Sequence, residues 1–158
     1  MLDEGFFLTI AGLAMSFAGF AGLMNALRHR GETWEPMELY QLRIIVAYAI
    51  TTLFGSVLVV PFVELFGQHD GVQWLGALML IASSALAVGN MRSDISGGHG
   101  TVLSRRVRAT FTTITVVGLI ALVGTVITGA PALYRLALIL MLAMPAGTFV
   151  YVVARINR

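Results

Sequence analysis

Apolar residues fill five long stretches of the chain, and short segments rich in charged and polar residues separate them. The stretches cover approximately residues 6–27, 44–66, 74–91, 111–128 and 132–154. A helix needs about 20 residues to cross a hydrocarbon core of about 30 Å. Because lipid offers no partner to backbone N–H and C=O groups, each stretch must satisfy these groups within its own helix. The pattern predicts an all-α integral membrane protein, with one domain over residues 1–158 and five transmembrane helices.

The connections between these stretches differ in kind. Gly129, Ala130 and Pro131 predict a tight hairpin, because glycine suits the end of one helix and proline the first turn of the next. Residues 93–104 are predicted to form a flexible linker. In residues 28–41, Thr33 is a candidate cap for a short interfacial helix that leads into the second span. The third stretch is the shortest, and we expect it to cross the membrane fully.

Composition supports membrane insertion. Apolar residues make up 58% of the chain and charged residues 11%, with a mean hydropathy of +0.87. Soluble domains carry about 25% charged residues, so this chain has too few charges to coat a soluble globule. All ten basic residues are arginines, and the chain contains no cysteine. Disulfides, thiolate metal sites and lysine Schiff bases are therefore excluded.

The distribution of arginine predicts an orientation. Only Arg135 falls on one side of the five spans, and the other nine fall on the opposite side: Arg28, Arg30, Arg43, Arg92, Arg105, Arg106, Arg108, Arg155 and Arg158. The positive-inside rule makes the nine cytoplasmic, which places the N-terminus outside and the C-terminus in the cytoplasm. Trp34, Tyr40 and Tyr151 are then predicted anchors at the inner interface, and Trp74 and Tyr134 at the outer one.

The first span has one bulky face and one face of small residues. In lipid, helices associate through close packing of small residues and through hydrogen bonds. The small face is therefore expected to be buried, and its candidate packing positions are Gly12, Ser16, Gly19 and Gly22.

A stripe of hydroxyl residues is the second candidate surface. Its members in the fourth span are Thr110, Thr113, Thr125 and Thr128, and the second span adds Tyr48 and Thr52. One interpretation is helix packing, in which threonine bonds its own i−4 carbonyl. The other is a narrow hydrated path, in which hydroxyls replace part of a solute's hydration. The sequence leaves both open.

Ionisable groups near the centre of the spans would be the strongest indication of active transport, because charge is costly there. The ionisable residues of the spans lie near the span ends instead. Two of them, Glu64 and Arg135, are predicted to form an ion pair at the outer mouth. His29, His69 and His99 all lie between spans, so haem ligation and a histidine metal site are not expected. No cofactor, metal site or catalytic constellation is indicated, and we do not expect an enzyme.

Two short motifs resemble a known group of proteins. Residues 17–23 read Phe-Ala-Gly-Phe-Ala-Gly-Leu, and residues 34–38 read Trp-Glu-Pro-Met-Glu. This part of the chain resembles a group of small, uncharacterised polytopic inner-membrane proteins of bacteria. The resemblance implies the bacterial plasma membrane as the location, and it implies no activity, cofactor or functional residue.

The sequence favours two functions. The first is a passive homo-oligomeric channel or pore for ions or small solutes, because no midplane charge supports active coupling. The alternative is a non-conducting accessory or scaffold protein that binds lipid or a larger membrane complex. The expected partners are the lipid bilayer and further copies of the chain, and the alternative function adds a larger membrane complex. Nucleic acid is not an expected partner.

Overall fold

The computed structural model describes residues 3–28, 36–97 and 105–156, and every element in these ranges is an α-helix. The helices are α1 (Glu4–Arg28), α2 (Pro36–Val57), α3 (Val59–Phe66), α4 (Gln68–Gly97), α5 (Arg105–Thr128) and α6 (Pro131–Ile156). Five segments are long and apolar enough to cross a membrane, and α2 and α3 together form one of them. The prediction of five long, apolar helices is therefore confirmed.

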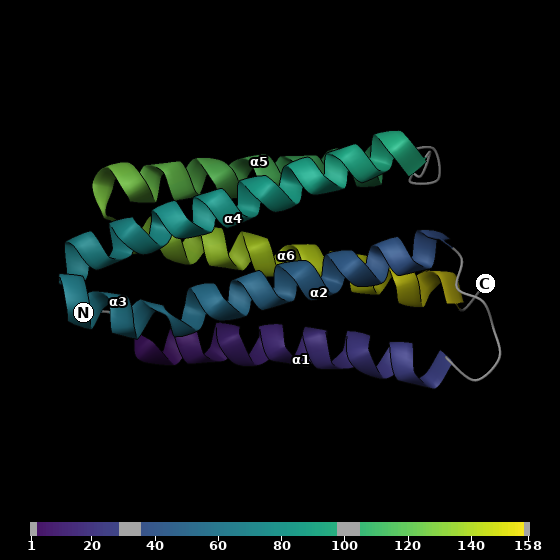
Figure 1. The fold of residues 1–158 in the computed structure, drawn as a ribbon, viewed down its shortest axis with the longest axis horizontal. Helices are drawn as coiled ribbons and strands as arrows, with labels where there is room; N and C mark the ends of the chain where they lie inside the picture. Colours follow the sequence, from purple (N-terminus) through teal and green to yellow (C-terminus); the bar gives the residue numbers. More distant parts are fainter. Residues whose placement is uncertain (1–2, 29–35, 98–104, 157–158) are drawn as a thin grey trace.

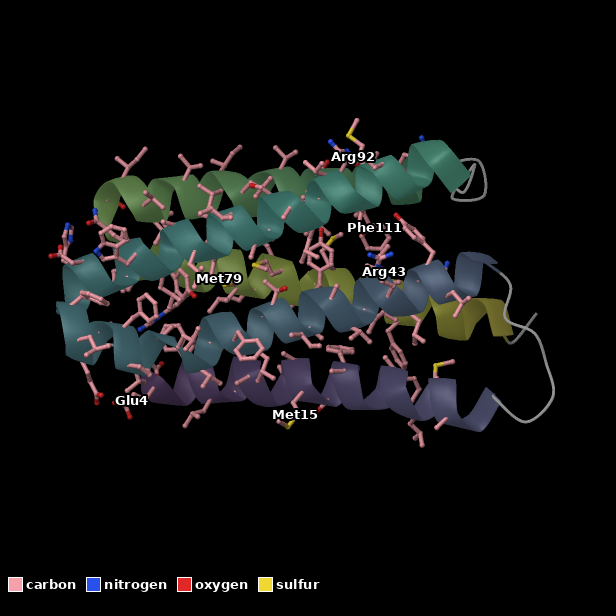
Figure 2. All side chains as sticks on the ribbon, in the orientation of Figure 1. Glu4, Met15, Arg43, Met79, Arg92 and Phe111 are labelled. Atoms are coloured by element: carbon pink, nitrogen blue, oxygen red, sulfur yellow. The ribbon has the colours of Figure 1, made fainter. Side chains whose placement is uncertain are left out.

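The long helices lie side by side and alternate in direction (Figure 1). Helices α2 and α6 are in contact near the middle; α1 packs on α2 and α6, whereas α4 and α5 pack on each other and on this pair. We call the end where α1 begins the acidic end, and there α3 meets α4 and α5 meets α6. We call the other end the arginine-rich end. Figure 2 shows Glu4 near the first end, with Arg43 and Arg92 toward the second.

A proline divides the second span into α2 and α3. Pro61 has no N–H to donate to the carbonyl of Val57, four residues earlier. The hydrogen bonds on either side persist: the N–H of Leu58 donates to the Phe54 carbonyl at 3.0 Å, and that of Phe62 to the Leu58 carbonyl at 3.1 Å. The missing bond explains why the span breaks at Leu58 and why α3 departs from the course of α2.

Two glycines with positive φ make the turns at the acidic end. Gly67, at φ 82°, connects α3 to α4, and Gly129, at φ 62°, connects α5 to α6. The Gly129 N–H donates to the carbonyl of Thr125 at 2.8 Å, and Pro131 is the first residue of α6. This geometry confirms the predicted hairpin at residues 129–131.

Helix α4 is longer than the sequence pattern indicated. It contains 30 residues, which makes it the longest of the described helices, although its apolar stretch, residues 74–91, is one of the two shortest. The helix continues past that stretch because the polar residues at both ends form the same backbone hydrogen bonds as apolar residues do. Residues 93–97, predicted as part of the linker, are helical. Thr33, the predicted cap, lies outside the described residues, as do Trp34 and His99.

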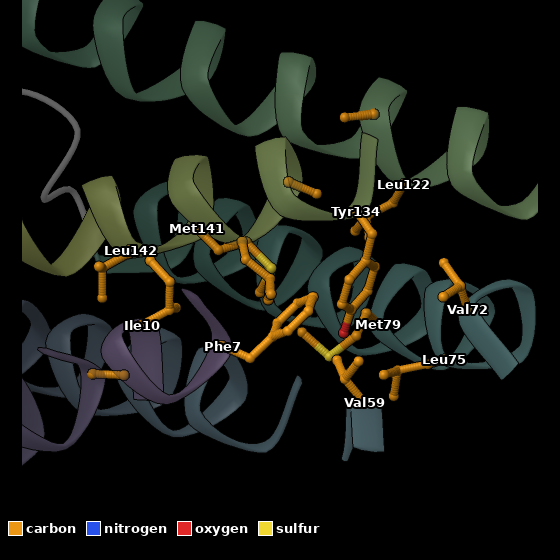
Figure 3. Close-up of a cluster of buried hydrophobic side chains, with 14 residues drawn as sticks. Phe7, Ile10, Val59, Val72, Leu75, Met79, Leu122, Tyr134, Met141 and Leu142 are labelled. Atoms are coloured by element: carbon orange, nitrogen blue, oxygen red, sulfur yellow. The ribbon is translucent and has the colours of Figure 1, made fainter. Parts of the chain in front are cut away.

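The core gathers in the half of the bundle nearest the acidic end (Figure 3). Phe7 of α1, Val59 of α3, Leu75 of α4 and Leu138 of α6 are buried there in one cluster. Gly55 of α2 lets α4 approach closely, because a Cβ at this position would lie 2.5 Å from the end of the Met79 side chain. A side chain at Gly55 would therefore displace the end of the Met79 side chain.

Candidate functional site

Tyr134 is the central polar contact of the core. Its side chain is fully buried, and its hydroxyl donates to the Gly55 carbonyl across the α6–α2 contact at 2.7 Å. The prediction that Tyr134 is an outer interface anchor is therefore wrong, because its ring points into the bundle. Trp74, the other predicted outer anchor, is 62% exposed on α4.

The next residue, Arg135, lies against two aromatic rings of α1. Its guanidinium carbon is 5.6 Å from the centre of the Phe6 ring and 5.9 Å from that of Phe7. The buried Nε atom has no hydrogen-bond partner. Glu64, the predicted ion-pair partner, is exposed on α3, and no ion pair joins these two described residues. The geometry replaces the expected salt bridge with cation–π contacts.

A small cavity lies among α2, α4, α5 and α6, and most of the residues that line it are apolar. Tyr48 is buried on α2 and lines this cavity together with Thr115 of α5. The cavity has a volume of about 20 Å³ and is lined by Tyr48, Ser83, Thr115, Met141 and Met144 among others. The Ser83 hydroxyl also lies 3.5 Å from the Met141 sulfur. A volume of this size holds about one water molecule, not a chain of them.

The threonine stripe does not form one surface within the chain. Its six predicted members divide between buried residues (Tyr48, Thr52 and Thr125) and exposed residues (Thr110, Thr113 and Thr128). Thr52 donates to the Tyr48 carbonyl at 2.8 Å and Thr125 to the Ala121 carbonyl at 2.9 Å. Thr128 donates to the Gly124 carbonyl and accepts the Ala130 N–H at the hairpin. These bonds match the interpretation that the hydroxyls support packing and turns.

The small residues of α1 divide between two sides of the helix. Ala11, Ala14 and Ala21 are buried against the rest of the bundle. The four predicted packing positions, Gly12, Ser16, Gly19 and Gly22, are all exposed. A Cβ built at any of the three glycines would meet no atom of this chain within 4 Å. Their packing against another helix therefore stays a prediction, and that helix would have to belong to another molecule.

Three of these exposed positions, Gly12, Ser16 and Gly19, belong to a longer surface that does not include Gly22. At 100° per residue, Gly5, Thr9, Gly12, Ser16 and Gly19 fall within about a quarter of the helical circumference, and all five are exposed. We call this surface the α1 outer stripe. The hydroxyls of Thr9 and Ser16 donate to the carbonyls four residues earlier, at 2.7 and 2.8 Å. The stripe is thus a shallow track whose donors are already satisfied.

No family model, curated protein or solved structure matches the chain. The resemblance to small bacterial inner-membrane proteins stays a prediction. Among the described residues, no group of three or more His, Asp or Glu side chains could hold a metal ion.

Sequence reasoning missed two features of these sites. Thr115 lies on a different side of α5 from the predicted stripe, yet it is the α5 hydroxyl residue that lines the same cavity as Tyr48. The contact between Arg135 and Phe6 was also missed. A signal existed for the second: an arginine near the end of an apolar span needs a compensating partner, and aromatic rings are such partners.

Proposed function

We propose that the protein is a non-conducting scaffold of a membrane, which assembles with further copies of itself through the α1 outer stripe. The observation that carries this proposal is the open space over the stripe. Gly12 and Gly19 let another helix backbone approach closely, and no side chain of the described residues uses that space. Close approach at small residues is the main way in which helices associate in lipid.

The satisfied hydroxyls of the stripe support packing over conduction. Thr9 and Ser16 each donate their proton to the carbonyl four residues earlier on α1. A helix that approaches the stripe therefore buries no unpaired donor and bears no cost for one. Inside a single chain, the cavity at Tyr48 has room for about one water molecule. In this proposal no path for a solute runs through one subunit, and no catalytic step is assigned to it.

A passive homo-oligomeric channel is the second candidate, and the length of the stripe is the observation that favours it. Residues 5–19 span about 21 Å at 1.5 Å per residue, a large part of a hydrocarbon core. If several copies turned this face toward a common axis, the small and hydroxyl residues of α1 would line a path between subunits. The channel and scaffold hypotheses thus use the same surface in different ways.

Flux through liposomes that contain the purified protein distinguishes these two functions. The scaffold proposal predicts that K⁺ and Cl⁻ cross no faster than in protein-free liposomes, at any applied potential. Flux that exceeds this background and is blocked in Ser16→Phe would contradict the scaffold and favour the channel. The matched control is Ile127→Phe, because Ile127 is 72% exposed on α5, away from the stripe.

The proposed location is the bacterial inner membrane, with the N-terminus outside and the C-terminus in the cytoplasm. This orientation is supported by the nine arginines that the sequence places on one side of the spans. The bundle brings the described starts of α2 and α5 and the end of α6 to one end, in agreement with that grouping (Figure 1).

A further inference from the structure

Arg135 lacks the polar partners that a guanidinium needs. Phe6 and Phe7 cover it with their rings, and its Nε atom is buried without an acceptor. No hydrogen bond or ion pair to Arg135 occurs among the described residues. A guanidinium carries five N–H donors and cannot lose its charge in a protein. The ring contacts hold the group in place, but they accept none of these N–H bonds.

The depth of Arg135 along α6 limits what the acceptor can be. The residue lies four positions after Pro131, where the helix and its apolar span begin. At 1.5 Å per residue this is about 6 Å below the start of the span. An arginine side chain at such a depth extends its charged group toward the membrane interface. Lipid phosphates are the acceptors that are abundant at that level.

We propose that Arg135, held by Phe6 and Phe7, binds the phosphate of a membrane phospholipid at the acidic end of the bundle. The planar guanidinium matches two phosphate oxygens with two parallel N–H bonds, which a lysine ammonium does not reproduce. The aromatic rings fix its orientation before the lipid arrives, so little side-chain freedom is lost on binding. The lipid supplies acceptors for the terminal N–H groups of the guanidinium, which are not buried and which no described residue bonds, whereas the buried Nε stays against the rings.

The charges around Arg135 select the type of headgroup. The acidic end carries four carboxylates, those of Asp3, Glu4, Glu64 and Asp70, and Arg135 is the one arginine described there. These five described side chains together carry a charge of −3, which repels a lipid with a net negative charge. A headgroup that combines phosphate with a primary ammonium complements both the arginine and the carboxylates. The structure therefore favours phosphatidylethanolamine over phosphatidylglycerol.

Native mass spectrometry of the detergent-purified protein, titrated with single lipids, tests this site. We expect phosphatidylethanolamine to bind more tightly than phosphatidylglycerol, and Arg135→Gln to weaken its binding about tenfold. Arg43→Gln is the matched control, because Arg43 is an exposed arginine of α2 toward the arginine-rich end, and it should bind as the parent does. Equal lipid binding by the parent and Arg135→Gln would overturn the proposal.

Three further arms separate the possible explanations. Inorganic phosphate at millimolar concentration should not displace the lipid; displacement would assign the site to a free anion instead. Glu4→Gln should reduce the preference for phosphatidylethanolamine over phosphatidylglycerol, and an unchanged preference would contradict the role of the carboxylates. If Arg135→Gln fails to fold, Arg135→Lys serves in its place, with weaker lipid binding expected because the planar fork is lost. Binding equal to that of the parent would then overturn the proposal.

Discussion

Two sets of glycines in this bundle do opposite things. At Gly55 in α2 and Gly76 in α4, side chains of neighbouring helices occupy the space beside the glycine. An added Cβ would lie 2.5 Å from a Met79 atom at the first and 2.9 Å from a Thr125 atom at the second. Gly12 and Gly19 in α1 face open space. The same residue type thus marks completed helix packing in one region and unused packing capacity in the other. Only the structure separates the two.

The largest expected effect comes from Gly55→Leu, which tests whether the space beside Gly55 and Gly76 is fully occupied by neighbouring side chains. The new side chain would overlap Met79 and push α2 away from the Tyr134 hydroxyl. We expect the free energy of unfolding to fall by about 3 kcal/mol, the upper range for overpacking a core. Reversible unfolding in mixed micelles measures this. Gly12→Leu is the control and should leave the stability of a single subunit unchanged.

Gly19→Leu tests the exposed glycines of α1. The leucine would enter the open space over the α1 outer stripe, where a Cβ at this position meets no atom of the other helices within 4 Å. We expect assembly to weaken about tenfold, or 1.4 kcal/mol, while the fold persists. Single-molecule photobleaching in liposomes at a series of protein-to-lipid ratios measures the change. Assembly equal to that of the parent would mean that this face of α1 is not an interface.

Tyr134→Phe sharpens the description of the inner region. It removes the hydroxyl that donates to the Gly55 carbonyl and keeps the ring that fills the core. A hydrogen bond between helices is worth about 1 kcal/mol, so we expect a loss of that size in the same unfolding assay. A loss below the error of the assay would show that ring packing alone holds α6 to α2.

Thr125→Val should have the smallest effect. The Thr125 hydroxyl donates only to its own Ala121 carbonyl, and the methyl group that packs on Gly76 is retained by valine. We expect a change in unfolding free energy of less than about 0.5 kcal/mol, because a satisfied i−4 bond adds little to a helix. A loss above about 1 kcal/mol would indicate that this hydroxyl serves another polar group.

The helical spans and the hairpin were predictable because they depend on local chemistry. An apolar run of about 20 residues dictates a helix in lipid, and Gly129 followed by Pro131 dictates the turn. The limits of α4 were less predictable. Hydropathy shows where the apolar stretch ends, but it does not show where the backbone hydrogen bonds of the helix end. Residues 93–97 stay helical for that reason.

The candidate sites were less predictable because they depend on which helices meet. Tyr134 lies near the start of its span, where aromatic residues often anchor a helix at the interface, yet here it completes the core. Arg135 has its aromatic partners on α1, more than a hundred residues earlier in the chain. The periodicity of one helix cannot reveal either contact, and it cannot say which of its small residues a neighbouring helix covers.

Disulfide cross-linking between copies tests the central claim, that the α1 outer stripe is an interface. The chain has no cysteine, so Ser16→Cys places a single thiol on the stripe and Ile127→Cys places one on the exposed side of α5. Oxidation in native membranes should convert Ser16→Cys into a covalent dimer, while Ile127→Cys stays monomeric. Absence of the Ser16→Cys dimer, or equal cross-linking at both positions, would contradict the account.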